Sequence, residues 1–269
     1  MAELVRVEVR WPVLLVTLAR PEKRNAVNEE MTLALDAAFG RLDDDPDLRV
    51  GVLAAEGPFF CAGTDLRTGA GPHTERGGMY GVIKRRRTKP LVAAVGGPAL
   101  GGGFELVLAA DLVVAARAAW FALPETTRGR VPAAGGLFRA PDRLPRNVAL
   151  ELMLTAGHLD AERAYQLGLV NRLVDAGPAP EADEVLRSAL ELALATCVSA
   201  PAAVTHLFAG LRSVSESADE VGWRTTQEAM TTLLTSDDRT EGNAAFEERR
   251  HPRWVPDDAV RWRVLEDRA

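Results

Sequence analysis

The chain contains few cysteines and histidines for its 269 residues. The two cysteines, Cys61 and Cys197, lie far apart in the sequence, which argues against a disulfide framework and favours a reducing compartment, the cytoplasm. The four histidines do not have the spacing of metal ligands. We therefore predict a protein without a metal site.

Long apolar runs and an excess of positive charge are also missing. No stretch of about 18 apolar residues occurs, and no basic head followed by an apolar run opens the chain, so we expect neither a transmembrane helix nor a secretory signal. The 32 Lys and Arg against 38 Asp and Glu give a net charge of -6, which disfavours nucleic acid and anionic membranes as partners. A hydrophobic content of 47% is typical of a globular chain with one large domain or two small ones.

Hydrophobic periodicity predicts strands that alternate with helices. The apolar positions Met31, Leu35, Ala38 and Leu42 recur at helical spacing after Asn28, which is a plausible N-cap. Such alternation favours an α/β fold with a mostly parallel sheet, followed by a helical last third. The predicted strands are 13–18, 50–54, 91–95, 111–115 and 169–174, and the predicted helices of the last third are 184–198, 202–214, 219–234 and 240–250.

Two turns rich in small residues follow predicted strands. One spans residues 61–64, and the other contains Gly101, Gly102 and Gly103 where a helix begins. Glycines there let a ligand oxygen approach free backbone N–H groups, but neither a P-loop nor a dinucleotide-binding pattern is present. An oxyanion hole built from one N–H of each turn fits better. Plain turns and tight helix–strand packing remain alternatives.

Two glutamates accompany these turns. Glu105 lies in the first turn of the helix that follows the glycines, and Glu125 lies twenty positions later, in a loop after the next strand. About twenty residues are enough for the chain to return to the same edge of a sheet, so both carboxylates can reach one cleft. Paired carboxylates in different environments divide acid and base work. Taken singly, each is also compatible with a solvated surface glutamate.

The motifs FCAGTDL, GPALGGGFELVLAADLVVA and AAWFALPETTRGRVPAAGG, in this order, resemble the crotonase family, also called the enoyl-CoA hydratase/isomerase family. The segments RPEKRNAVN, ALELMLTAGHLDAERAYQLGLVNRLV and SDDRTEGNAAFEERR extend the resemblance over nearly the whole chain. It implies an α/β crotonase-like spiral of ββα repeats in residues 1–199, which holds the acyl-CoA site. Residues 200–269 would form a helical C-terminal region that assembles homotrimers or homohexamers.

The resemblance also implies roles for individual residues. The N–H groups of Thr64 and Gly102 would form the oxyanion hole for the thioester carbonyl. Glu105 would deprotonate the water that attacks C3, and Glu125 would deliver a proton to C2. The residues expected to contact the acyl-CoA are Arg24, Ala26, Ala62, Asp65, Leu66 and Ala133.

Some positions depart from the family pattern. Thr64 carries a larger side chain than the usual alanine, and the glycine-rich loop of residues 67–80 leaves the acyl specificity open. The basic run Lys84, Arg85, Arg86 and Arg87 is interpreted as a solvated helix face, with binding of the CoA phosphates as the alternative.

We therefore predict an enoyl-CoA hydratase that adds water reversibly across the 2,3 double bond of a 2-enoyl-CoA and needs no cofactor beyond the CoA of its substrate. An enoyl-CoA isomerase, which can work with Glu125 alone, and a carnitinyl-CoA-type dehydratase are the enzymatic alternatives. A binding protein on the same scaffold is the non-enzymatic one. The acidic net charge and the intact glutamate pair count against it.

Overall fold

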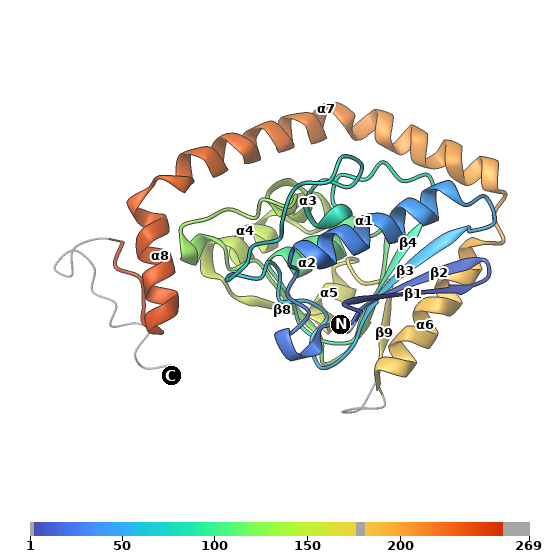
Figure 1. Cartoon of the computed structure of the whole chain (residues 1–269), viewed down its shortest axis with the longest axis horizontal. Helices are drawn as coiled ribbons and strands as arrows, with labels where there is room; N and C mark the ends of the chain where they lie inside the picture. Colours follow the sequence, from blue (N-terminus) through green and yellow to red (C-terminus); the bar gives the residue numbers. More distant parts are fainter. Residues whose placement is uncertain (1–2, 176–180, 255–269) are drawn as a thin grey trace.

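The computed structural model describes residues 3–175 and 181–254, and a six-stranded sheet organises these residues (Figure 1). The strand order is β1-β2-β3-β4-β6-β9, in which β1 is antiparallel to β2 and every later pair is parallel. The expected α/β class with a mostly parallel sheet is thus confirmed. The strands are β1 (Val5–Arg10), β2 (Val13–Leu18), β3 (Val50–Ala55), β4 (Leu91–Val95), β6 (Leu112–Ala116) and β9 (Arg172–Val174).

The central strands are apolar because both faces of the sheet are covered. Helix α1 (Glu29–Asp44) packs against β1, β2 and β3 on one side, and α6 (Glu181–Thr196) packs against β2, β3, β4, β6 and β9 on the other (Figure 1). Strands buried on both faces are expected to be continuous apolar runs, as β2 and β4 are. The predicted N-cap is confirmed, because the Asn28 side chain accepts a hydrogen bond from the Met31 N–H at 3.0 Å.

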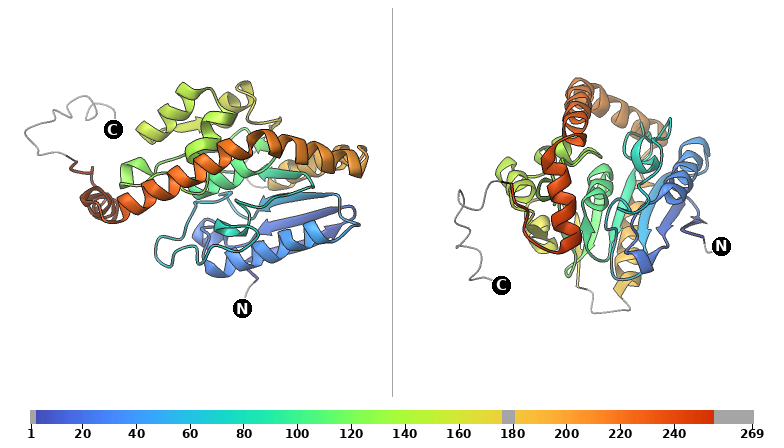
Figure 2. Two further views of the ribbon diagram at one scale, coloured as in Figure 1. Left: turned by 90° about the horizontal axis from the view of Figure 1, so that it is seen from above. Right: turned by 60° about the vertical axis from the view of Figure 1, so that its left-hand side comes forward.

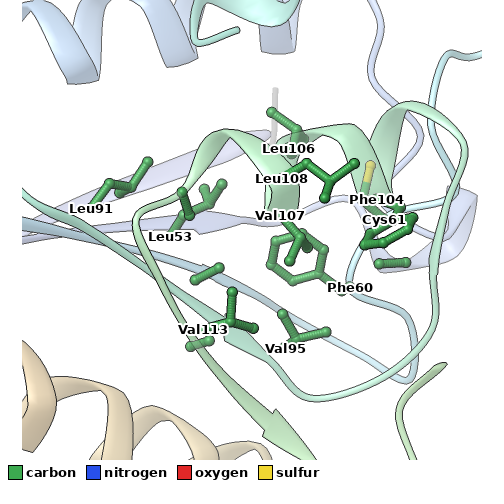
Figure 3. Close-up of a cluster of buried hydrophobic side chains, with 14 of the residues drawn as sticks. Leu53, Phe60, Cys61, Leu91, Val95, Phe104, Leu106, Val107, Leu108 and Val113 are labelled. Carbon is green, nitrogen blue, oxygen red and sulfur yellow. The ribbon is translucent and has the colours of Figure 1, made fainter. Parts of the chain in front are cut away.

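A smaller three-stranded sheet carries the glycine-rich turn. It consists of β5 (Ala99–Leu100), β7 (Trp120–Ala122) and β8 (His158–Asp160), and α2 (Gly102–Ala109) leaves it directly after β5. Apart from Glu105, all residues of helix α2 are apolar or glycine, which is typical of a helix inside a core. Figure 3 shows Phe104, Val107 and Leu108 packed among side chains of the surrounding strands. The turn at Gly102 is therefore held by a rigid core on both sides.

The C-terminal third is helical, as predicted, but it contains one long helix where two were expected. Helix α7 (Pro201–Leu234) runs without a break through residues 215–218, because this segment has no proline or glycine to interrupt it, and the Ser215 hydroxyl bonds back to the Arg212 carbonyl at 3.4 Å instead of capping a new helix. Figure 1 shows α7 arching over the rest of the chain, and in Figure 2, seen from above, α1 and α4 (Arg146–Thr155) project on either side of it. Helix α8 (Asp237–Glu248) then contacts the short helix η3 (Thr126–Arg128), which directly follows Glu125.

Several other elements differ from the sequence-based expectation. Residues 169–174 form a shorter strand, because the N–H groups of Leu169 and Val170 bond to the Ala164 carbonyl at the end of α5 (Ala161–Gln166). The sequence analysis did not predict β1, although VRVEVR alternates apolar and charged residues, nor did it predict the short strands of the small sheet or the eight-residue helix α3 (Gly136–Arg143).

The basic run at residues 84–87 is not a solvated helix face. Arg85 is buried and forms ion pairs with Asp36 and Asp43 of α1, and Arg87 pairs with Asp111. The positive charges of Arg85 and Arg87 are thus neutralised inside the fold.

The predicted C-terminal region begins at the turn between α6 and α7, and its residues 255–269 lie outside the described part of the chain. The division at residue 199 stays a prediction. Within residues 3–175 and 181–254, no single helix is long and apolar enough to cross a membrane. Helices α6 and α7, bent by 99° at their junction, reach that length and composition only as a pair.

Candidate active site

All ten residues proposed for the site line one cavity of about 620 Å³. The cavity lies where the turn after β3, the turn before α2 and the loop after β7 meet. Segments that are distant in sequence thus converge on one space of the size expected for a small-molecule site. The ten residues are Arg24, Ala26, Ala62, Thr64, Asp65, Leu66, Gly102, Glu105, Glu125 and Ala133.

Two backbone N–H groups face this cavity without a protein partner. The Gly63 carbonyl accepts from the Val27 N–H at 2.8 Å, and a trans peptide therefore directs the Thr64 N–H the opposite way. Gly102 is the first residue of α2, so its N–H has no acceptor within the helix. Among the described residues, neither group donates a hydrogen bond to the protein. The two turns touch, since a Cβ on Gly63 would lie 3.0 Å from the Gly102 nitrogen.

Glu105 is a buried carboxyl group with defined backbone donors. It is 3% exposed, and its Oε1 accepts a hydrogen bond from the Gly136 N–H at 2.8 Å. Burial raises the pKa of Glu105 above its usual value of 4.5, the negative charge of Glu125 raises it further, and the N–H groups of Gly136 and Ala134 oppose the rise. The side chain is therefore oriented by the backbone yet holds its proton more tightly than an exposed glutamate.

Glu125 faces the same cavity from the opposite turn. Its Oε1 would lie 2.7 Å from a Cβ placed on Gly101, so the carboxyl group lies directly beside the Gly102 turn. Its Oε2 is buried and has no hydrogen-bond partner among the described residues. Burial raises the pKa of Glu125 too, while the positive charges of Arg128 and Arg130 lower it. The two carboxyl groups thus titrate as a coupled pair with both values above 4.5.

Two predicted site residues also support the fold. Asp65 is 8% exposed and pairs with Arg20, whose Nη1 lies 2.8 Å from Asp65 Oδ2 and also donates to the Ala26 carbonyl at 2.8 Å. This pair joins the Ala26 and Asp65 turns on one wall of the cavity. The neighbouring Cys61, which is not one of the predicted site residues, is fully buried, and burial raises the pKa of its thiol to about 12.

The structure adds residues that the sequence patterns did not indicate. Tyr80, from the glycine-rich loop, reaches the centre of the site through a hydrogen bond to Thr64. Arg128, Arg130 and Arg239 line the cavity, with Arg239 and Phe246 contributed by α8. In the sequence, only the arginines of ETTRGRVP and SDDRTEG could have indicated these residues, and the sequence does not show that the two segments lie at the same cavity.

Comparisons with known proteins agree with this architecture. The sequence profile of the enoyl-CoA hydratase/isomerase family matches residues 8–257. A carnitinyl-CoA dehydratase of Salmonella typhimurium is 39% identical over 265 residues, covering 94% of this chain and 99% of the relative. The crystal structure of a carnitinyl-CoA hydratase from Mycobacterium avium superposes with a TM-score of 0.86 at 38% identity, again covering 94% and 99% of the two chains. The crystal structure of an enoyl-CoA hydratase from Mycobacterium tuberculosis superposes with a TM-score of 0.73 at 42% identity and with the same coverage of the two chains.

The fold and the matched residues define an α/β protein of the crotonase fold that processes CoA thioesters. The chain belongs to the enoyl-CoA hydratase/isomerase family, which confirms the resemblance seen in its motifs. It is an enzyme of the hydratase or dehydratase type, a lyase reaction, and an acyl-CoA is its substrate.

Proposed function

We propose that this enzyme hydrates a 2-enoyl-CoA reversibly, with Glu105 and Glu125 as the acid–base pair. The observation that carries the proposal is the placement of two buried carboxyl groups on one cavity beside two unpartnered N–H groups. In the hydration direction, Glu105 removes a proton from the water as its oxygen bonds to C3. The electrons of the double bond move to C2 and the thioester oxygen, and Glu125 then protonates C2.

The backbone and the burial of the site support these roles. Negative charge develops on the thioester oxygen, and the N–H groups of Thr64 and Gly102 are positioned to stabilise it without reorganisation. Hydration needs one ionised and one protonated carboxyl group at the same time. The raised pKa values of Glu105 and Glu125 favour a pair that shares one proton near neutral pH, whereas two ordinary glutamates would both be ionised; hydration proceeds from the form of the pair in which that proton is on Glu125.

Positive side chains around the cavity suit the CoA moiety, which carries several phosphate charges. Lys23, Arg24, Arg128, Arg130 and Arg239 all line the cavity. Among the described residues, none of the three arginines at 128, 130 and 239 forms a salt bridge with a carboxylate. Unpaired guanidinium groups are strong donors for phosphate oxygens. The acyl chain enters between the glutamates, past the loop that contains Met79 and Tyr80.

Dehydration of carnitinyl-CoA is the second candidate, because several relatives carry that name and the water chemistry at C2 and C3 is the same. A carnitinyl group ends in a trimethylammonium cation, which proteins commonly bind against aromatic faces. One face of Phe246 is covered by the Arg128 guanidinium, whose carbon lies 4.3 Å from the ring centroid, and this positive charge would repel a second cation placed against the ring. This observation favours an uncharged enoyl group over the cationic one.

The test is the loss of the ultraviolet absorbance of the conjugated thioester when the enzyme is mixed with substrate. Crotonyl-CoA is expected to react at least tenfold faster, by kcat/KM, than crotonobetainyl-CoA. Enoyl-CoAs of increasing length and branching then define the acyl pocket. Absence of hydration with every enoyl-CoA would contradict the proposal and favour a binding role.

Assembly through the C-terminal helices completes the proposal. Large apolar side chains on α7 and α8 are exposed in the single chain, among them Leu211 at 60% and Phe246 at 50%. Exposed apolar surface of this kind is typical of an interface. We expect a homotrimer or a dimer of trimers, and light scattering at micromolar concentration that reports a monomer would refute it.

A further inference from the structure

Tyr80 places a phenol hydroxyl between the two residues of the proposed oxyanion hole. Its oxygen lies 2.7 Å from the Thr64 hydroxyl oxygen. It also lies so close to Gly102 that a Cβ atom there would overlap it. The side chain is 2% exposed and lines the same cavity as Glu105. No other side-chain hydroxyl group among the cavity residues is bonded to Thr64.

The backbone holds Tyr80 in this place against a local preference. Its φ of 56° is in the left-handed region, where a bulky residue is an outlier that costs about 1–2 kcal/mol. Gly78 and Gly81 on either side also have positive φ, of 65° and 72°. The turn packs against α1, since a Cβ on Gly81 would lie 2.6 Å from the Thr32 carbonyl oxygen. A strained residue kept in position by its surroundings and directed at a cavity points to a function.

The hydroxyl pair leaves one proton available to a ligand. Each hydroxyl can donate one hydrogen bond, and the contact between Thr64 and Tyr80 uses only one of the two protons. Among the described residues, neither hydroxyl has a second protein partner. Burial, and after it the negative charge of Glu105, raises the pKa of Tyr80 well above 10, so the phenol keeps its proton at neutral pH. When Thr64 donates to Tyr80, the phenol proton is free to point into the cavity.

We infer that the Tyr80 hydroxyl donates a third hydrogen bond to the thioester oxygen as negative charge develops on it, and that the Thr64 hydroxyl orients this donor. No proton is transferred from Tyr80. The phenol adds a side-chain donor to the two backbone N–H groups, and water addition at C3 and protonation at C2 proceed through the glutamates. This inference rests on the proposed function, because it assigns a group to the same oxyanion hole.

The variant Tyr80→Phe tests the inference, because it removes only the hydroxyl and keeps the ring that fills the space beside Gly102. Loss of one oxyanion donor typically lowers the rate by about 10²–10³. We expect kcat for crotonyl-CoA to fall by about 10²-fold, with KM within a few-fold of the parent. Thr64→Val, which removes the orienting hydroxyl, is expected to lower kcat by about tenfold. Tyr165→Phe is the matched control, since Tyr165 is the second of two tyrosines and is 49% exposed on α5; it should behave like the parent.

A second measurement reports on the oxyanion hole without hydration. Acetoacetyl-CoA can ionise to an enolate that absorbs in the ultraviolet, so the enolate fraction of the bound ligand would measure how well the site stabilises the charged oxygen. The enolate fraction should fall in Tyr80→Phe, partly fall in Thr64→Val and stay unchanged in Tyr165→Phe.

The outcomes separate this inference from the proposed function. If the parent hydrates crotonyl-CoA and Tyr80→Phe retains both kcat and the enolate fraction, the inference is overturned and the proposed function stands. A change confined to KM also overturns it, because Tyr80 would then only shape the pocket. If no enoyl-CoA is hydrated but the enolate fraction depends on Tyr80, the proposed function fails and the inference stands.

Discussion

Replacement of each glutamate by glutamine is the sharpest test of the acid–base assignment. Glutamine keeps the size of the side chain, and its carbonyl can still accept the hydrogen bond that Gly136 donates to Glu105. A general acid–base group typically contributes about 10²–10⁴ in rate, which corresponds to about 2.7–5.4 kcal/mol of barrier. We expect Glu105→Gln and Glu125→Gln each to lower kcat for crotonyl-CoA within this range. The double variant should be scarcely slower than the slower single one, because the residues act together.

The same variants should change stability in a direction that the structure determines. Folding raises the pKa of Glu105 above its value of about 4.5 in the unfolded chain. The contribution of the protonated Glu105 to the free energy of unfolding is therefore fully present below pH 4.5 and is lost as the pH rises through the pKa of the folded state. Each unit of elevation corresponds to about 1.4 kcal/mol at a pH above both values. Glu105→Gln should therefore match the parent in thermal melting near pH 4 and exceed it at pH 9.

The assay compares 2-enoyl-CoA with 3-enoyl-CoA, using the absorbance of the conjugated thioester. An isomerase that works with Glu125 alone predicts that Glu105→Gln moves a 3-enoyl double bond at nearly the parental rate. If Glu105→Gln hydrates crotonyl-CoA within a few-fold of the parent while Glu125→Gln is inactive, the two-glutamate hydratase mechanism is refuted.

Further predictions concern the surroundings of the site. The pH profile of kcat should be bell-shaped with both limbs above pH 4.5, because the pair is inactive when both carboxyl groups are protonated or both ionised. Arg128→Ala removes a positive charge that lowers the pKa of Glu125, so it should move the pH profile of kcat to higher pH; an unmoved profile would contradict this coupling. Arg128→Ala should also raise KM for crotonyl-CoA about tenfold or more and make KM less dependent on salt concentration. Steady-state kinetics at increasing salt concentration measure both effects. Asp65→Ala leaves Arg20 buried without its partner and should cost about 3–5 kcal/mol in urea unfolding, whereas a loss below 1 kcal/mol would mean that the pair is unimportant for the fold.

The candidate site could be predicted in outline because its residues lie in contiguous motifs. Gly102 and Glu105 share one turn, and Thr64 follows the small residues of another, so sequence order alone put them near strand ends. The strands at 13–18 and 91–95 and the N-cap at Asn28 were also predictable, since apolar runs and capping residues act within a few positions.

Other features depended on contacts between distant segments. The helices expected at 202–214 and 219–234 form one helix, because residues 215–218 contain no proline or glycine and the Ser215 hydroxyl bonds back within the helix instead of capping a new one. The basic run at 84–87 predicts a solvated Arg85, whereas in the structure Asp36 and Asp43 of α1 form ion pairs with it. No local pattern reports such partners.

By itself, the sequence determined the main alternation of strands and helices, the family and the chemical groups of the site. Only the tertiary structure decided the electrostatics of that site and its complete membership. Burial, which depends on the whole core, raises the pKa values of Glu105 and Glu125, and α8 brings Arg239 to a cavity lined mainly by residues more than a hundred positions earlier. Tyr80 reaches Thr64 because its loop folds back onto α1 in a left-handed turn. These properties arise from packing between segments far apart in the chain, and a pattern of neighbouring residues does not encode them locally.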